Sequence, residues 1–341
     1  MYKLEIFDDQ MVYAAAVMLS REQTIEQDYL AYDAYTVTVP KHIPCKKGWY
    51  THITDGAATV ADGIVADVQP GDGTMSISIR PLAALMDVEV YQDTSIADCI
   101  GWLTETITAQ FVSNPDTAQN RPLALTQTAA RTALPLSVEP GVINLLGIVK
   151  RALTTHRVVV DCRLDMAALK VAVSIRQETA ERTLEADLPN VIGTPQITLG
   201  DSYGAANKAI LRRMDADGNL LGTYTYYLHT DGTVSDVDTD RVTPVFWTIR
   251  DIGVDDAPAS VAGGILGPKQ YDNEIILTYR AGDLIARPLE LPIGAKVAIR
   301  YEGQTYTSML TGRAIRAGMV DLIFGQVRVA LTKRLILERR T

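Results

Sequence analysis

The chain has 341 residues, with 32 Lys and Arg against 41 Asp and Glu, and a formal net charge of −9. This length exceeds that of one hydrophobic core, so two or three domains are expected. The acidic balance excludes a protein that coats nucleic acid or an anionic membrane over its whole surface. No apolar run reaches the roughly 18 residues of a membrane-spanning helix, and the start, MYKLEIFDDQ, lacks the pattern of a secretory signal.

The three cysteines, Cys45, Cys99 and Cys162, lie far apart in the sequence. No CxxC pair occurs among them, so neither a disulfide framework nor a zinc knuckle is expected. The cysteine pattern therefore favours a reducing compartment.

Residues 1–92 alternate apolar and polar side chains in short runs, which is typical of antiparallel strands and hairpins. The sequence PGDG at residues 70–73 predicts a turn between two of these runs. A barrel or small sandwich would bury Met75, Ile77 and Ile79 on one face and remove exposed sheet edges. We therefore predict a first β-barrel over residues 1–92. Its predicted strands are residues 2–7, 35–39, 63–68 and 75–79.

Residues 93–185 predict an α/β domain of two helices and a hairpin. The sequence SIAD at 95–98 resembles a capping box, and apolar residues follow at helical spacing, so a helix is predicted over residues 95–112. A second helix is predicted to start at EPGV, residues 139–142, where proline suits a first turn, and to continue through Leu153. Residues 157–164 and 169–176 then predict two strands.

From Pro195 onward the alternating pattern returns. We predict a second β-barrel from residues 186–240 and 275–341, interrupted by an insertion at 241–274 with a short helix. The fold class is mainly β with α/β insertions (α+β), that is, two β-barrel domains plus smaller α/β domains. The predicted strands are residues 197–199, 209–214, 224–228, 274–279, 296–301, 304–310 and 319–324. Hairpin turns are expected at residues 217–219, 231–232 and 302–303, and the short helix within residues 255–267.

The stretch DGTVSDVDTDR at residues 231–241 holds four aspartates and suggests a calcium-binding loop. An EF-type loop needs glycine at position 6 and glutamate at position 12. Counting from Asp236 places Arg241 and Trp247 there, and a count from Asp215 fails in the same way. Because Asp and Gly are also ordinary turn residues, we expect metal-free hairpin turns at both stretches.

Other chemical motifs are sparse. His42, Cys45 and His52 are close in sequence, but their spacing matches no common zinc site and a fourth ligand is missing. No GxSxG, HExxH or GxxxxGK[ST] motif occurs, and nothing places the carboxylate pair of Glu178 and Glu181 in a cleft. We therefore assign no catalytic, cofactor-binding or metal residue, expect no cofactor, and expect no enzyme activity. The remaining histidines are His156 and His229.

Tyr224, Tyr226 and Tyr227 form the densest aromatic cluster. Strand alternation places the first two on one face and Tyr227 on the other. Cross-strand packing is expected, with stacking on a sugar or a partner protein as the alternative. The C-terminal residues 328–340 carry five basic side chains and only Glu338 as an acid, which fits either a docking edge or a solvated tail.

Several passages together resemble the baseplate hub and tail-associated proteins of phages and prophages. Near the N-terminus they are DGIVADV at 62–68 and GTMSISIRPLAALMD at 73–87. The middle passages are NKAILR at 207–212, YTYYLHTDGTV at 224–234 and RVTPV at 241–245. The last are YTSMLT at 306–311 and LIFGQVRVALTK at 322–333, so the resemblance runs in order through most of the chain.

The resemblance implies a virion structural protein, a hub of two related β-barrels with smaller α/β pieces, that forms a homotrimer at the tail tip. Two similar barrels in each of three chains would match a six-fold tail tube or distal tail protein on one side and a three-fold spike or fibre on the other. The tape-measure protein is a further expected partner. Specific nucleic-acid binding and a membrane span are not expected. Such a protein would be made in the bacterial host cytoplasm and would act in the virion tail tip.

Many tail-associated proteins continue into a peptidase, lysozyme-like or fibre module, whereas this sequence stops at Thr341, directly after the expected second barrel. An enzymatic or receptor-binding role is therefore not expected. Two alternatives stay open: a phage tail cell-wall hydrolase, and a carbohydrate-binding module of a tail that uses Tyr224 and Tyr226.

Overall fold

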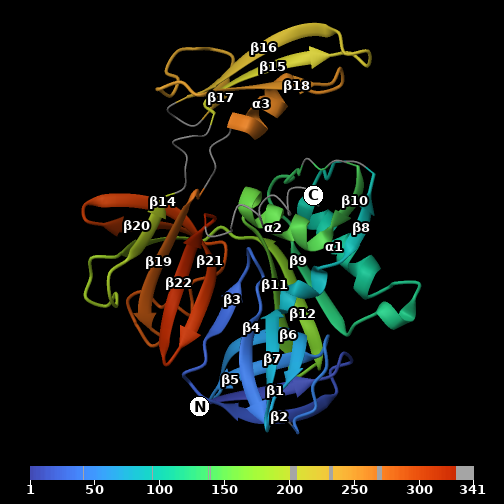
Figure 1. The fold of residues 1–341 in the computed structure, drawn as a ribbon, viewed down its shortest axis with the longest axis vertical. Coiled ribbons are helices and arrows are strands. Elements are labelled where there is room, and N and C mark those ends of the chain that lie inside the picture. Colours follow the sequence, from blue (N-terminus) through green and yellow to red (C-terminus); the bar gives the residue numbers. More distant parts are fainter. Residues whose placement is uncertain are drawn as a thin grey trace. The chain divides into compact units, whose positions relative to one another are not determined.

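The computed structural model describes residues 1–40, 42–93, 95–136, 138, 140–199, 206–229, 233–266 and 271–327. Leu199–Asp272 forms one unit, and the rest of the described chain forms the other. Strands dominate both units, and the larger sheets are curled into half-barrels (Figure 1). The predicted class, mainly β with helical insertions, is confirmed.

The first sheet follows from the alternating N-terminal sequence. Its six antiparallel strands have the order β2-β1-β5-β6-β7-β4. The strands predicted at residues 2–7, 35–39, 63–68 and 75–79 are all confirmed, and Gly71 N donates to Thr74 O (2.7 Å) in the predicted turn. The core takes alternate side chains, such as Val37 of β4 and Ile77 of β7. The strands are β1 (Tyr2–Phe7), β2 (Tyr13–Leu19), β4 (Tyr35–Pro40), β5 (Tyr50–Asp55), β6 (Ala58–Pro70) and β7 (Thr74–Pro81).

The short strand that follows β2 in the sequence, β3 (Ile25–Asp28), belongs to a different sheet. It pairs antiparallel with β21 (Gln304–Arg316), so that Ile25 lies opposite Ile315 (Figure 1). Ile25 is fully buried in the core of the first sheet. The N-terminal segment is therefore tied directly to the C-terminal sheet, through a strand whose polar sequence, IEQD, carries no strand signal.

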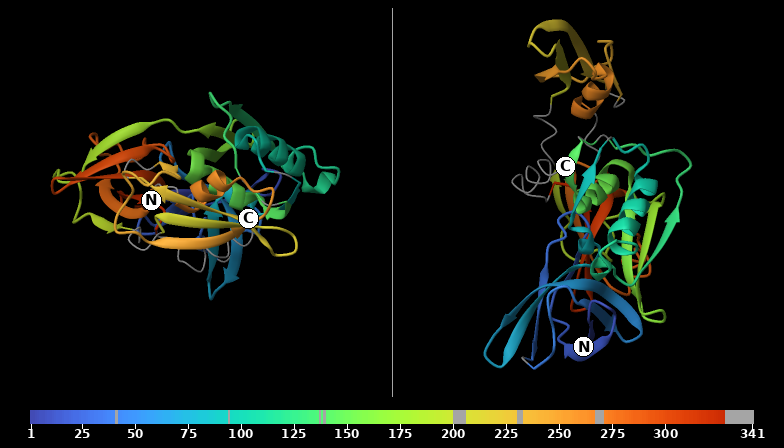
Figure 2. Two further views of the ribbon diagram at one scale, coloured as in Figure 1. Left: turned by 90° about the horizontal axis from the view of Figure 1, so that it is seen from above. Right: turned by 90° about the vertical axis from the view of Figure 1, so that its right-hand side faces the viewer.

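Two helices and a three-stranded sheet form the middle of this unit. β11 (Val158–Asp165) pairs antiparallel with β12 (Lys170–Gln177), and β9 (Leu123–Thr128) runs parallel to β12. The helices α1 (Cys99–Phe111) and α2 (Leu145–His156) share one core with this sheet (Figure 2). The segment also contains η1 (Leu82–Met86), β8 (Glu89–Gln92), η2 (Thr117–Gln119) and β10 (Gly141–Asn144), which pairs with β8.

Both helices begin later than predicted. Asp98, not Ser95, is the N-cap of α1, because its carboxylate accepts a hydrogen bond from Gly101 N (3.1 Å). Asn144 is the N-cap of α2 and accepts from Gly147 N (3.0 Å). The residues after Pro140 form strand β10 instead of a first helical turn. The strands predicted at residues 157–164 and 169–176 are confirmed.

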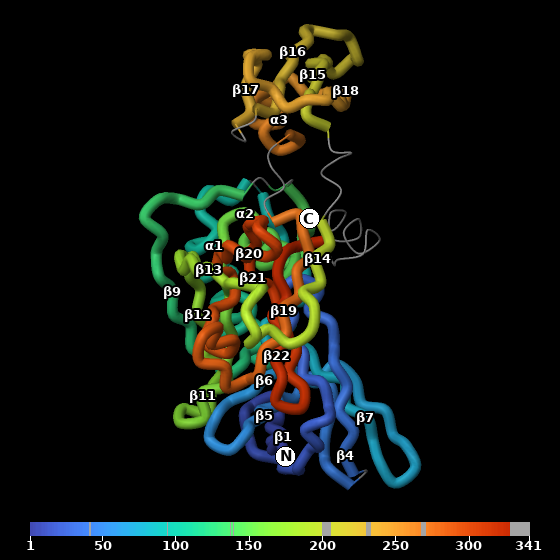
Figure 3. The backbone as a smooth tube through the Cα atoms, turned by 90° about the vertical axis from the view of Figure 1, so that its left-hand side faces the viewer, coloured from blue at the N-terminus to red at the C-terminus, as the bar shows by residue number. Residues whose placement is uncertain are grey.

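The second large sheet has the order β13-β20-β21-β22-β19-β14, with β3 added at β21. Figure 3 labels the six strands of the main order. The predicted turn at Glu302 and Gly303 joins β20 to β21, and both residues have positive φ (48° and 75°), as a tight hairpin requires. The remaining strands are β13 (Glu181–Glu185), β14 (Gln196–Leu199), β19 (Asn273–Arg280), β20 (Lys296–Tyr301) and β22 (Met319–Gly325). The strands predicted at 197–199, 274–279, 296–301, 304–310 and 319–324 match these elements.

A buried polar cluster fixes one end of this sheet. Asn273 donates from Nδ2 to Thr307 O (3.0 Å) and accepts from Ser308 Oγ at its Oδ1 (2.6 Å). Thr311 Oγ1 donates to Gly325 O (2.9 Å). Gly325 has a φ of 84°, and a Cβ there would lie 1.8 Å from Asn273 O. Only glycine therefore permits this approach of β22 to β19.

The unit Leu199–Asp272 contains a four-stranded sheet of order β17-β16-β15-β18. The helix α3 (Pro258–Leu266) packs on one face, with Leu211, Ile252 and Ala262 among its core residues (Figure 1). The helix predicted within residues 255–267 and the strands predicted at 209–214 and 224–228 are confirmed. The strands are β15 (Lys208–Met214), β16 (Leu220–Leu228), β17 (Val234–Ser235) and β18 (Trp247–Ile252).

The observed sheets differ from the predicted domain boundaries. Residues 186–240 are predicted to belong to the second barrel, yet β15 and β16 pair with β18 in a separate sheet. Conversely, β13 lies in the predicted α/β segment of residues 93–185 but pairs with β20. The alternation of apolar and polar residues indicates which residues form strands. It does not indicate which strands pair, because pairing depends on packing between distant parts of the chain.

Candidate functional site

Metal ligands do not gather in the described ranges. Among these residues, no three His, Cys, Asp or Glu side chains are placed to hold a metal ion. His42 is exposed and Cys45 is half-buried, where burial raises the pKa of its thiol to about 11. His52 is turned toward Asp62, with Nδ1 2.6 Å from Oδ1. The structure therefore does not assemble a zinc site from His42, Cys45 and His52.

In the first aspartate-rich stretch, hydrogen bonds within the turn itself engage the carboxylate of Asp215. Asp215 Oδ1 accepts hydrogen bonds from Asp217 N (3.0 Å) and Asn219 N (2.7 Å), so this carboxylate closes the hairpin between β15 and β16. Hydrogen bonding to Asn219 lowers the pKa of Asp215. In DGTVSDVDTDR, Asp231 and Gly232 lie outside the described residues, and Val234 returns in β17 as predicted. The aspartates that follow are exposed: Asp236, Asp238 and Asp240.

The tyrosine cluster divides between the two faces of its sheet, as predicted. Tyr224 and Tyr226 pack against the core under α3, which leaves less of their rings for stacking on a sugar. Tyr227 lies on the other face, where Lys208 Nζ is 5.6 Å and the Arg241 guanidinium 5.3 Å from its ring centroid. On the same face Trp247 is 66% exposed.

The two candidate acid–base glutamates have separate partners. Glu178 is buried and accepts hydrogen bonds from Ala180 N (2.9 Å) and from Arg176 (3.3 Å). Glu181 is exposed and pairs with Lys296 (3.3 Å). The two carboxylates therefore share no partner among the interactions described. The basic residues 328–340 lie outside the described residues. None of the described helices has the length and apolar character needed to cross a membrane.

The first sheet contains a buried pair of His52 and Asp62, and Asp62 also connects this sheet to the middle of the large unit. Asp62 of β6 bonds to His52 of β5 through Oδ1, and its Oδ2 accepts from Leu164 N of β11 (2.9 Å). The two side chains, His52 and Asp62, are only 9% and 5% exposed. The hydrogen bond to Asp62 raises the pKa of His52, and burial acts in the opposite direction. Sequence reasoning missed this pair, because no strand is predicted around His52 and the strand predicted at residues 63–68 begins after Asp62.

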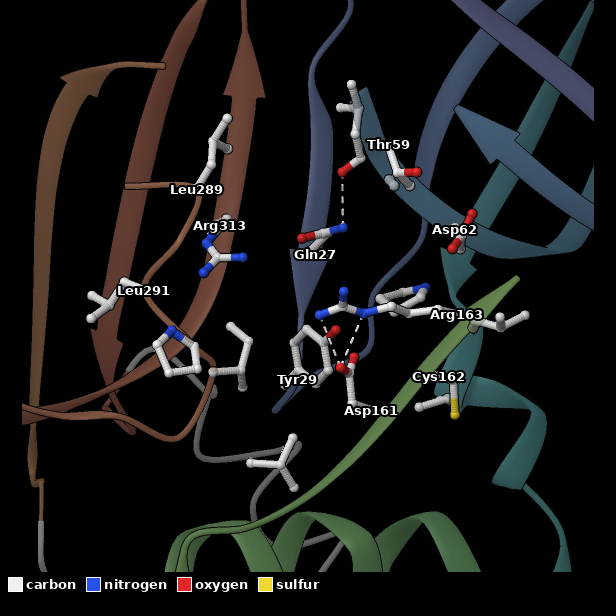
Figure 4. A pocket seen from close by; sticks show the side chains of 18 of the residues that line it. Gln27, Tyr29, Thr59, Asp62, Asp161, Cys162, Arg163, Leu289, Leu291 and Arg313 are labelled. Carbon is white, nitrogen blue, oxygen red and sulfur yellow. Dashed lines mark hydrogen bonds and ion pairs between the residues drawn. The ribbon is translucent and has the colours of Figure 1, made fainter. Parts of the chain in front are cut away.

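One cavity of about 280 Å³ lies inside the large unit, where β3, β6, β11 and β21 meet (Figure 4). Its apolar wall includes Leu291, Pro292 and Ile293 from the segment before β20. The opposite wall is polar and carries Asp62, Asp161, Arg163 and Arg176. Leu289, at the rim, is 48% exposed, so the cavity opens to solvent there.

Most charges in the cavity are paired. Asp161 accepts from Arg163 (3.0 Å) and lies 3.9 Å from Arg176, which also bonds to Glu178. The negative charge of Asp161 raises the pKa of Arg163. Glu290, at the rim, pairs with Arg287 (3.4 Å). The carboxylates on this surface are thus already engaged.

Arg313 is the exception among the charged groups of the cavity. It projects from β21 into the cavity (Figure 4), and its Nε has no hydrogen-bond partner among the described residues. Its Nε is fully buried, and burial lowers its pKa. Tyr29 also lines the cavity and interacts electrostatically with Arg313, and burial raises the pKa of its hydroxyl. Neither residue carries a sequence motif, so no signal pointed to them.

No family sequence model and no protein of curated function matches the chain by sequence. Solved structures do match its fold. A tail protein from Neisseria meningitidis MC58 is 13% identical, with a TM-score of 0.57, over 95% of this chain and 96% of that one. A chain of the phage P2 baseplate in its activated conformation with Ca is 13% identical, with a TM-score of 0.57, over 97% and 100%. A prophage tail protein from Listeria monocytogenes is 10% identical, with a TM-score of 0.55, over 99% and 98%.

Proposed function

We propose that this chain, which has the fold of phage tail and baseplate proteins, is the structural hub of a phage or prophage tail tip. The observation that carries the proposal is the extent of the likeness, which covers at least 95% of this chain and at least 96% of each tail protein compared. Because identity is 13% or less, the likeness speaks for the fold, and the hub role is an inference from it.

The arrangement of two large curled sheets in one unit supports an adaptor role. Three copies of the chain would present six such sheets, which suits contact with a six-fold tail tube or distal tail protein. The same trimer would offer three-fold symmetry to a central spike or fibre. We propose no catalytic role. The tape-measure protein is a further proposed partner, and the proposed location is the virion tail tip.

Light scattering on the purified chain tests the proposal. A homotrimer would have three times the 37.2 kDa mass of one chain, and negative-stain images should show rings of three-fold symmetry. The same measurement is repeated after mixing with a tail-tube protein and a distal tail protein from the same genome, because assembly can require a partner. A chain that stays monomeric alone and binds neither protein would refute the hub role.

A further inference from the structure

We propose that the cavity between β3, β6, β11 and β21 is a binding site for one carboxylate group, held by Arg313 and the hydroxyl of Tyr29. The inference does not rest on the hub role. Its starting point is a guanidinium whose Nε is fully buried without a partner in the described chain. A buried charge without a partner is costly, so a site that retains one is suited to an anion that enters from solvent.

The charges that line the cavity favour a ligand with a single negative charge. Asp161 is paired with Arg163 and approached by Arg176, Asp62 is bonded to His52, and Glu290 is paired with Arg287. The negative charge of Asp161 acts on Arg313, but this carboxylate is already paired with Arg163, so the positive charge of Arg313 matches one further negative charge. A phosphate dianion would add a second charge beside three existing carboxylates, which is unfavourable. A carboxylate also fits the planar donors of an arginine in a bidentate geometry.

The residues that line the cavity indicate which chemical group the ligand carries beside its carboxylate. Leu291, Pro292 and Ile293 lie on the apolar side of the cavity, while Arg313 and Tyr29 supply donors (Figure 4). A volume of about 280 Å³ is below the usual range of drug-sized pockets, roughly 300–1,000 Å³. The site therefore suits a short aliphatic carboxylate. Two sources share this chemistry: a free short-chain acid, and a glutamate or aspartate side chain of a second copy of this chain.

Calorimetric titration with propionate tests the site, with propionamide as the neutral ligand of the same shape. We expect the wild type to bind propionate at least tenfold more tightly than propionamide. R313M should weaken propionate binding at least tenfold and Y29F should weaken it less, because Tyr29 donates a single neutral hydrogen bond. R316M is the matched control, since Arg316 lies on the same strand but is exposed near Glu22 (3.8 Å). R313M should keep the wild-type circular dichroism, because methionine removes an unpaired charge and retains most of the side-chain length.

Self-association separates the two sources. If a second copy supplies the carboxylate, R313M and added propionate should both weaken self-association in light scattering, while R316M should not. If a free acid is the ligand, propionate binds and self-association is unchanged. Either result supports the site. Equal behaviour of wild type and R313M in both measurements, or equal binding of propionate and propionamide, would mean that the cavity holds only water and would overturn the proposal. If the chain is monomeric, the titration alone decides the matter.

Discussion

The substitution Asp62→Asn should destabilise the large unit in a pH-dependent way. Asp62 bonds to His52 (2.6 Å) and to Leu164 N (2.9 Å), and both side chains of the ion pair are nearly buried. Removing one member of a buried pair costs about 3–5 kcal/mol. Asparagine can still accept from Leu164 N, so we expect about 3 kcal/mol at pH 6, the lower end of that range.

The sign of the pH dependence follows from the raised pKa of His52. A group with a raised folded pKa contributes stability that is fully present below its unfolded pKa, about 6.5 for histidine, and is lost as pH rises through the folded pKa. Above the folded pKa the imidazole is neutral and can accept a hydrogen bond from the side-chain amide that the substitution introduces. The loss caused by the substitution should then fall to about 1 kcal/mol, the value of one ordinary hydrogen bond.

Differential scanning calorimetry at pH 6 and pH 9 measures both values. For a unit of this size 1 kcal/mol corresponds to about 2–4 °C in Tm, so the Tm should fall by about 6–12 °C at pH 6 and by about 2–4 °C at pH 9. Arg21→Gln is the control, because it breaks an exposed pair with Asp55 in the same region and should change Tm little at either pH. An equal loss at both pH values, or no loss, would refute the assignment of His52 as a charged partner.

Three further predictions concern other parts of the chain. Gly325→Ala should cost at least about 2 kcal/mol more in urea unfolding than Gly303→Ala, because both glycines have positive φ but only the first meets Asn273 O; equal costs would contradict the clash. Leu211→Ala should cost about 2–5 kcal/mol and lower only the calorimetric transition of the unit Leu199–Asp272, whereas Leu277→Ala should lower only the other, since both leucines are fully buried; a shared shift would show that the units unfold together. Millimolar calcium should leave the Tm unchanged, because Asp215 already accepts hydrogen bonds from its own turn; a rise of many degrees would show a calcium site.

Local sequence patterns predicted the positions of strands and helices better than they predicted which strands pair with each other. The β19, β20, β21 and β22 strands follow from alternation, and the hairpin at Glu302 and Gly303 follows from turn chemistry. The helix starts were misplaced because capping depends on which polar side chain reaches a free N–H, and Asp98 reaches one where Ser95 does not. β3 was missed because the sequence IEQD has one apolar residue, and its pairing comes from the neighbouring β21.

The candidate site could not be predicted from the sequence at all. Arg313 and Tyr29 are 284 positions apart and belong to no motif, so only the pairing of β3 with β21 brings them to one cavity. The sequence by itself determined the β-rich class, most strands and turns, and the resemblance to tail hub proteins, because these depend on local periodicity and short motifs. The tertiary structure alone decided which strands share a sheet, where the units divide, and which charges are left without a partner, because those depend on contacts between distant parts of the chain.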